Sequence, residues 1–229
     1  MSTTPALANF SGIDLERLPS ITRGEARVVR ARALRATEQS LVGYGHFVDD
    51  FARAEVTIVP WPVRGPRPLV PGTGIEGGTV EDRFVMERRG QVQYAVNHAV
   101  ARSYVTGWFE DPARAREDAA PADTSRIYTH EANYHPDGGQ IFFPLEVSPF
   151  VALLARPGDD VRAEDFVAFW FDGTRGVHID PGVWHQPVFP IAERAVFDNR
   201  QGRVHACVSI DFVGELGVFI EVPLSLEPR

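Results

Sequence analysis

The feature that most constrains the fold of this chain is a series of short apolar runs between His130 and His185, each closed by turn residues. Three of them are rich in Phe, Val and Ile and are bounded by Gly, Pro and Asp: Gln140–Leu145, Pro149–Ala155 and Phe166–Phe171. Short runs of β-branched and aromatic residues between such turn residues are typical of strands in an antiparallel sheet. The sequence therefore predicts a mainly β fold.

The same pattern extends over the rest of the chain. Further strands are expected at Arg27–Leu34, Val56–Pro60, Arg83–Arg88 and Gln91–Val96, and two more in Val204–Pro223, joined at Gly214 or Gly217. Arg89-Gly90 is expected to form a hairpin turn. Thr37 is placed to cap a short N-terminal helix through Gln39–Val42.

The domain organisation follows from where turn residues concentrate. Residues 1–26 are expected to form an irregular N-terminal arm, and residues 27–229 a single barrel domain, because no linker-like segment interrupts them. The Pro- and Gly-rich stretch at about 60–78 is predicted to be a loop or an insertion. Residues 111–125 are polar and alanine-rich, which predicts a surface excursion with at most one helical turn.

Charge and composition exclude several classes of partner. The net charge is −8 and the pI is near 5.4, whereas nucleic acids and anionic membranes bind basic faces. No apolar run approaches the roughly 20 residues that span a bilayer, and no secretory signal is visible, so a cytoplasmic location is expected. The single cysteine, Cys207, cannot form an internal disulfide.

The chain contains no lysine, and all 23 basic residues are arginines. This composition excludes chemistry that depends on a lysine Schiff base or on the lysine of a phosphate-binding loop. No nucleotide cofactor is expected. An anionic substrate would have to be held by arginine, by backbone amides or by a metal ion.

Polar residues lie at the ends of the predicted strands. His135 and Gln140 flank the DGG turn, while His178, Asp180 and His185 bracket a PG turn. Closing the sheet into a barrel would bring both groups together, and titratable groups that converge in one cavity are typical of a functional site. We therefore expect His135, His178, Asp180 and His185 to be catalytic. Asp180 as a turn cap and His178 as a rim residue are the structural alternatives.

Two segments carry a family resemblance. HPDGGQIFFPL and GVHIDPGVWHQPVF resemble the two halves of a cupin barrel, and more narrowly the ureidoglycolate lyases, which have an HE run before HP…Q.F.PL and a later GV…VWH.P segment. The resemblance runs from about Arg27 to about Asn199, with a poorly matching middle. It implies a cupin-like antiparallel β-barrel of the jelly-roll type.

The resemblance also bears on a metal site. Metal-binding cupins supply HxH and Glu from the first half and His from the second; the corresponding residues here are Asn133, His135, Gln140 and His185. Amide oxygens are weak, uncharged ligands. The expected ligands His135, Gln140 and His185 should therefore bind a divalent ion (Ni, Mn, Fe or Zn) weakly unless Asp180 or His178 joins them. Whether a metal is bound stays open.

The implied reaction is cleavage of a carbon–nitrogen bond in ureidoglycolate to give glyoxylate and urea, a step of allantoin degradation in purine catabolism. It needs a base, an acid and a group that holds the carboxylate. Gln140, Asn133, Arg200 and Trp184 are expected to bind this small carboxylate substrate; Arg88 and Arg102 are alternatives to Arg200 as the carboxylate partner. Where the family has Asn-Tyr-His followed by His-His, this chain has His178-Ile179-Asp180 and His185-Gln186, which leaves the substrate open.

Two other function classes stay open. One is a metal-dependent cupin oxygenase or isomerase acting on a small acid, and the other is a ligand-binding cupin without catalysis. The apolar Val204–Pro223 segment is expected either to complete the barrel or to form the interface of a homodimer, because exposed strand edges of this hydrophobicity are normally covered.

Overall fold

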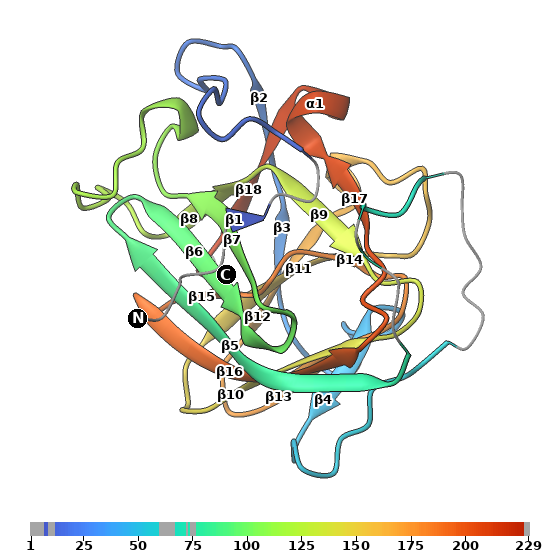
Figure 1. Ribbon diagram of the computed structural model, residues 1–229. Coiled ribbons are helices and arrows are strands. Elements are labelled where there is room, and N and C mark those ends of the chain that lie inside the picture. The colour runs from blue at the N-terminus through green and yellow to red at the C-terminus, as the bar shows by residue number, and fades with distance from the viewer. Residues whose placement is uncertain (1–6, 9–11, 60–66, 72, 74–76, 227–229) are drawn as a thin grey trace, which may run out of the picture.

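The computed structural model describes residues 7–8, 12–59, 67–71, 73 and 77–226. These residues are mainly β, which confirms the predicted fold class, and they form two sheets that face each other (Figure 1). In spatial order the first sheet contains β2 (Arg27–Arg30), β18 (Val218–Pro223), β8 (Arg126–Thr129), β7 (Arg102–Trp108), β6 (Val92–Asn97), β5 (Thr79–Arg89), β16 (Arg194–Gly202), β10 (Gln140–Pro144), β13 (Gly176–Ile179) and β4 (Gly45–Val48), with β1 (Leu7–Ala8) on β7.

The second sheet lies across the interior from the first. It contains β17 (Val208–Asp211), β9 (Glu131–Tyr134), β14 (Trp184–His185), β11 (Phe150–Ala155), β12 (Val167–Phe171) and β3 (Arg32–Arg35), with β15 (Phe189–Pro190) on β11. Over the described residues neither sheet closes on itself, since β2 and β4 end the first and β17 and β3 end the second. The cupin-like fold is thus a pair of facing sheets rather than a barrel closed by hydrogen bonds.

Helical structure is short in the described ranges. The α-helix α1 covers Phe212–Leu216, and three 3-10 turns cover η1 (His98–Val100), η2 (Pro112–Arg114) and η3 (Ala163–Asp165). The segment η2 is the helical turn expected in residues 111–125. The predicted N-terminal helix at Gln39–Val42 is wrong: residues 38–44 form hydrogen-bonded turns. Thr37 does cap this segment, because its Oγ1 accepts from Ser40 N at 3.0 Å, and Gly43, at a φ of 86°, ends it after a single turn.

The strand predicted nearest the N-terminus serves both sheets. The predicted strand Arg27–Leu34 is divided at Ala31 into β2 and β3, which pair in parallel with β18 and β12 respectively. Ala31 is 3% exposed and its N–H donates to Glu221 O at 2.9 Å, so the bend itself is held in the core. One continuous segment of the chain therefore connects an edge of the first sheet to an edge of the second.

The central strands match the sequence predictions closely. β10, β11 and β12 fall within one residue of the expected runs, and β5 and β6 form the expected hairpin. Gly90 in its turn has a φ of 52°, and a Cβ there would lie 2.4 Å from Glu117 O, so the turn requires glycine. The strand expected at Val56–Pro60 is wrong for its described part: within it Ile58 forms a single bridge to Gly138.

The C-terminal segment forms two strands, as predicted, joined by α1 and closed by Gly217 at a φ of 66°. β18 pairs with β2 on one side and β8 on the other, so it completes the first sheet and offers no open edge. This contradicts a dimer interface built on that strand. The homodimer itself stays a prediction.

The interior between the sheets is apolar at one end. Inward-facing side chains of both sheets form a Phe-rich cluster that includes Phe84, Phe142, Phe150, Phe169 and Phe197. Burial of aromatic side chains on this scale supplies the main stabilisation of a two-sheet fold. The same strands also carry polar residues, which lie at the other end of the space between the two sheets.

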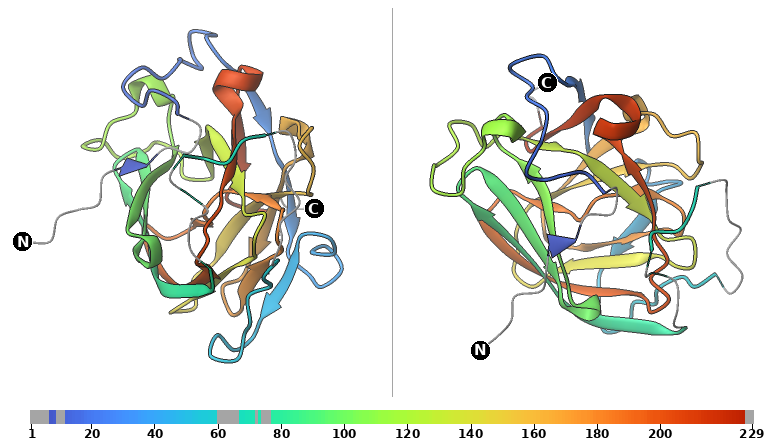
Figure 2. Two further views of the ribbon diagram at one scale, coloured as in Figure 1. Left: turned by 45° about the vertical axis from the view of Figure 1, so that its right-hand side comes forward. Right: turned by 45° about the horizontal axis from the view of Figure 1, so that its top comes forward.

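Other features lie outside this interior. Figure 2 shows α1 at one end of the molecule and the loop after β4 projecting at the other. Of the loop expected at about 60–78, residues 60–66, 72 and 74–76 lie outside the described residues. None of the described helices has the length and apolar character needed to cross a membrane.

Candidate active site

The polar end of the interior is built by the alternation of strand residues. Gln140 on β10 is opposite Gln201 on β16, and Phe142, which lies in the interior, is opposite Asn199 on β16. The amides of Gln140, Gln201 and Asn199 therefore face the interior with Phe142. Asn97 at the end of β6 joins them. The four amide side chains are at most 4% exposed.

The amides are fixed by one another. Gln140 Nε2 donates to Asn199 Oδ1 at 2.8 Å and to Gln201 Oε1 at 3.2 Å, and Asn97 Nδ2 donates to Gln201 Oε1 at 2.8 Å. Asn199 Nδ2 donates to the same Gln201 oxygen at 3.2 Å. Since the Gln140 amide nitrogen faces two acceptors, its oxygen must face the other way, toward the histidines.

Two predicted histidines meet that oxygen. His135 follows β9 and His185 ends β14, and their ring centroids are 5.1 Å apart. His135 Nδ1 lies 3.0 Å from Ala206 O, and His185 Nδ1 lies 2.8 Å from Val183 O. A carbonyl can only accept, so each Nδ1 carries the proton and each Nε2 presents a lone pair.

Three acceptor atoms therefore converge. His135 Nε2 and His185 Nε2 each lie 3.2 Å from Gln140 Oε1, with no donor between them among the described residues. This arrangement is satisfied by a cation or by a proton on one imidazole. Burial lowers the pKa of His185 to about 3 and also lowers the pKa of His135, so both rings are neutral near pH 7. The set thus suits a metal ion.

A small cavity opens beside these atoms. It is lined by Phe84, Asn97, Tyr104, Asn133, His135, Gln140, His185, Pro187 and His205, and its volume is about 20 Å³. That space accommodates about one water molecule or an ion. Asn133 is 3% exposed, and its Oδ1 has no hydrogen-bond partner among the described residues. A buried carbonyl oxygen in that state calls for a donor from a ligand or water.

Two cavity-side residues were missed by sequence reasoning. His205 was not among the residues expected at the site, yet it lines the cavity with its ring 5.0 Å from His135. Cys207 Sγ lies 3.4 Å from His135 Nδ1 and 3.8 Å from His205 Nε2, and the three side chains place ligand atoms within 4.8 Å of one another. The available signal was the His-x-Cys pair just before the strand at Val208, because both residue types are metal ligands.

His178 and Asp180 do not join this site. His178 is opposite Ile141, which packs outside the sheet with Val48 and Val56, whereas the neighbouring pair Gln140 and Ile179 faces inward. The predicted convergence of His178 and Asp180 with His135 and His185 is therefore wrong: one register step places them on the opposite face.

On that outer face His178 forms a cluster of its own. Its ring stacks on His46 at 4.6 Å, and its Nδ1 lies 3.2 Å from Asp180 Oδ1. His46, His178 and Asp180 have the proximity of a metal set. However, Thr57 N–H donates to His178 Nε2 at 3.2 Å, so His178 Nδ1 carries the proton and offers no lone pair.

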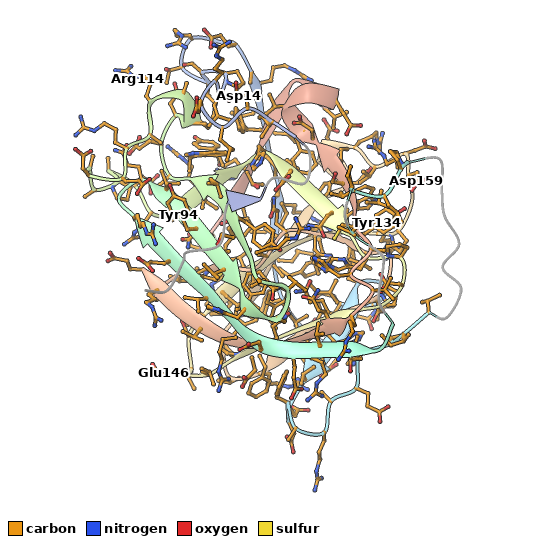
Figure 3. The ribbon with its side chains drawn as sticks, viewed as in Figure 1. Asp14, Tyr94, Arg114, Tyr134, Glu146 and Asp159 are labelled. Atoms are coloured by element: carbon orange, nitrogen blue, oxygen red, sulfur yellow. The ribbon has the colours of Figure 1, made fainter. Side chains whose placement is uncertain are left out.

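Two predicted substrate-binding residues are also directed elsewhere. Arg200 is opposite Ile141 and faces outward, where its guanidinium pairs with Glu81 at 2.7 Å. Trp184 is fully buried on the face opposite His185, and its Nε1 donates to Gly158 O at 2.7 Å. Trp184 packs edge-on against Tyr134, whose hydroxyl points toward Asp159 (Figure 3). Glu146, also labelled there, lies at the lower edge of the molecule and is exposed.

Of the two alternative arginines, Arg88 and Arg102, only the charge of Arg102 acts on side chains of the site. Arg88 pairs with Glu193 and covers the Phe109 ring. Arg102 is opposite Asn97 and shares the inward face with Tyr104. Burial lowers the pKa of His205, and the positive charge of Arg102 adds to that shift. Burial raises the pKa of the Cys207 thiol, and the same charge opposes that rise only in part. Arg102 has no acidic partner in the described parts of the chain.

Comparison with known proteins places this site in a family. The profile described as ureidoglycolate lyase matches residues 90–213. A ureidoglycolate lyase of Azotobacter vinelandii is 32% identical over 115 residues, which cover 48% of this chain and 69% of the relative. One of Stutzerimonas stutzeri is 33% identical over 131 residues, covering 54% and 77%, and one of Pseudomonas savastanoi is 40% identical over 75 residues, covering 32% and 44%. The profile match starts after the expected Arg27 and continues past Asn199 through β17.

Proposed function

Since the chain belongs to the ureidoglycolate lyase family, we propose that it is a carbon–nitrogen lyase that splits ureidoglycolate, or a closely related carboxylated hemiaminal, into glyoxylate and urea. The observation that carries the proposal is the polar cavity in which His135, His185 and Gln140 converge on one point. Nothing in an apolar two-sheet core requires such a group of buried acceptors, and their desolvation is costly without a ligand.

The hydroxyl proton of the substrate would be taken by Nε2 of His185, which is neutral because burial holds its pKa at about 3, so the polar substrate must strengthen this base when it fills the cavity. The proton leaves the oxygen, the carbon–oxygen double bond forms, and the carbon–nitrogen bond breaks with its electron pair on nitrogen. The same imidazole can then return the proton to that nitrogen, because both atoms are attached to one carbon. His135 lies beside His185 and would contact the same hydroxyl and nitrogen atoms of the substrate. Val183 O holds His185 in the tautomer that this role requires.

The carboxylate of the substrate would pair with Arg102, which replaces Arg200 in this role. A buried carboxylate needs a fixed positive partner, and a guanidinium offers two parallel donors. Asn133 Oδ1, unpartnered in the described structure, would accept an N–H of the ureido group. The substrate is larger than the 20 Å³ cavity, so lining side chains must move when it binds.

A divalent metal ion fits the site on the chemistry of its donors. His135 Nε2, His185 Nε2 and Gln140 Oε1 would hold it, as three neutral acceptors that converge. When bound, such an ion supplies Lewis acidity toward a substrate oxygen. The amide oxygen carries no charge, so affinity for the ion should be modest. A bound ion would occupy the Nε2 lone pair of His185, so the proton transfers assigned above apply to the metal-free site.

The test is the release of glyoxylate and urea from racemic ureidoglycolate by the purified protein, with and without chelator. We expect His185→Ala to reduce kcat/KM at least about a hundredfold, since general base catalysis contributes that much. His98→Ala, at an exposed histidine, is the matched control. Turnover that survives in His185→Ala would refute the base assignment. Absence of turnover with any metal would refute the lyase proposal and favour a binding protein.

Metal content separates the second enzyme class. A cupin oxygenase needs a redox-active ion, so stoichiometric iron or another transition metal together with oxygen consumption would point to that class instead.

A further inference from the structure

The cavity at the candidate active site has one apolar wall. Most of its lining side chains carry nitrogen or oxygen atoms, namely those of Asn97, Tyr104, Asn133, His135, Gln140, His185 and His205. The two apolar ones are Phe84 and Pro187. Phe84 lies on β5 of the first sheet and Pro187 follows β14 of the second, so both sheets contribute to the apolar wall.

Phe84 is fixed at the boundary between this cavity and the Phe-rich cluster. In the register of the first sheet it is opposite Asn97, which lines the cavity, and opposite Phe197, which belongs to the cluster. Its ring packs on Phe142 with the centroids 5.2 Å apart and stacks on Tyr104 at 6.2 Å, and Phe84 is 2% exposed. A ring held on several sides in a close-packed interior is displaced only at a cost. The movement that admits a substrate is therefore expected from other lining side chains.

The substrate of the proposed function has a carbon with a single apolar substituent. The carbon that is separated from nitrogen carries a hydroxyl group, a carboxylate, a ureido group and one hydrogen. Buried polar groups need hydrogen-bond partners, so the three polar substituents turn toward polar residues and the hydrogen turns toward Phe84 and Pro187. This orientation holds whichever polar residue each polar substituent contacts.

We propose that Phe84, together with Pro187, determines specificity by leaving room for hydrogen, and for no larger group, on that carbon. The chain then accepts hydroxy acids derived from glyoxylate and excludes those derived from pyruvate or longer 2-oxo acids, in which an alkyl group replaces the hydrogen. This role of Phe84 rests on the proposed function in that the substrate is a hydroxy acid that enters this cavity. One added methylene changes recognition in an apolar pocket by about 10- to 200-fold, which sets the size of the expected effect.

The two enantiomers of lactate isolate the contact with Phe84. Each has the hydroxyl group and the carboxylate of glycolate, and its methyl group replaces one of the two hydrogens on the same carbon. With the polar groups held in place, the methyl group of one enantiomer points to the apolar wall, and that of the other points to the place of the ureido group. Calorimetry with metal-free protein at neutral pH measures the dissociation constants of glycolate, D-lactate and L-lactate. We expect the native chain to bind one lactate at least about tenfold more weakly than it binds the other lactate and glycolate.

A smaller side chain at position 84 should remove this difference. Phe84→Leu should bring the dissociation constants of the two lactates to within about threefold of each other. Phe84→Met nearly keeps the volume but has a flexible side chain, so it should narrow the same ratio and serves if Phe84→Leu folds poorly. Phe171→Leu is the matched control. Phe171 lies in the same Phe-rich cluster, is 1% exposed, stacks on Phe150 at 4.6 Å and does not line the cavity, so the ratio should stay at its native value.

The outcomes separate this role of Phe84 from the lyase proposal. Equal binding of the two lactates by the native chain, or no binding of any of the three acids, would overturn the role of Phe84. A ratio that persists in both Phe84 variants, or that falls as far in Phe171→Leu, would do the same. If the ratios change as expected but no glyoxylate is released from ureidoglycolate, the lyase proposal fails while the role of Phe84 stands. If glyoxylate is released and the two lactates bind equally, the role of Phe84 fails while the lyase proposal stands.

Discussion

Replacing Gln140 with glutamate tests the convergence of acceptors that underlies the proposed site. Gln140 Nε2 donates to Asn199 Oδ1, so a carboxylate there leaves that buried oxygen without its partner and costs about 1–3 kcal/mol. Gln201 Oε1 loses one of its donors and keeps two. The new carboxylate also faces the lone pairs of His135 and His185 at about the same distances.

Protonation of the new side chain sets the remaining cost. If burial raises the folded-state pKa of the introduced carboxyl group by about two units, holding the charged form adds about 2.7 kcal/mol near pH 7. We therefore expect metal-free Gln140→Glu to be about 4–6 kcal/mol less stable than the native chain at about pH 7.5. A raised folded-state pKa means that the folded protein binds more protons, so the deficit should shrink as the pH falls toward the unfolded value near about 4.3.

A divalent ion should reverse the order. Glutamate supplies the charge that the amide lacks, so saturating Mn²⁺ or Zn²⁺ should stabilise Gln140→Glu more than it stabilises the native chain. The assay is urea unfolding with chelator and with metal, and Gln39→Glu, at an exposed position, is the control. A metal-free Gln140→Glu as stable as the control, or equal metal stabilisation of both, would refute the idea that Gln140 Oε1 and the two Nε2 atoms form one acceptor set.

Two further predictions concern stability. Gly139→Ala should lower the free energy of unfolding, measured with urea, by about 2–3 kcal/mol, because its Cβ would lie 2.6 Å from His178 Cε1, His178 Nε2 and Ile179 O, and His178 is fully buried. Gly77→Ala is the control and should be neutral, because its Cβ meets nothing within 4 Å. Equal urea midpoints for the two variants would contradict the packing at Gly139. His130 is 1% exposed, both ring nitrogens lack a hydrogen-bond partner in the described structure, and burial lowers its pKa to about 3. A histidine with a lowered folded-state pKa contributes stability that is complete above about pH 6.5 and is lost as the pH falls toward about 3. The native chain should therefore lose stability between about pH 7.5 and 5, and His130→Leu should remove about 2 kcal/mol of that loss. An unchanged pH dependence in His130→Leu would show that His130 is already charged or solvated.

The sequence was sufficient for the central strands and for three residues of the site, although it also predicted a helix at Gln39–Val42 and a strand at Val56–Pro60 that are wrong. Strands such as β10, β11 and β12 have strong patterns between clear turn residues, and their bounds were predicted within one residue. His135, Gln140 and His185 were predicted together because each ends a strand or flanks a turn. The geometry brings these three together, and their chemical roles remain predictions.

The rest of the site depended on pairing between distant segments. His178 and Asp180 share a face, as their spacing indicates, but which face is decided by the register of Ile179 with Gln140, and local sequence does not contain that register. The same one-residue step separates Arg200, which faces outward, from Gln201, which faces the cavity. His205 lies far along the chain from His135, and only the folded chain brings their rings to 5.0 Å.

The division of residues 27–35 between two sheets has a consequence for synthesis of the protein. β2 pairs with β18, the last strand described, so the first sheet cannot be completed until the chain has left the ribosome as far as Pro223. Such distant pairing makes folding slow, and until it occurs the apolar side chains that share a core cluster with β18, such as Ile127, Leu153 and Phe212, lack part of their cover. A truncation that removes β18 would leave both β2 and β8 without that partner, and we would expect such a nascent fragment to be held by chaperones rather than to fold.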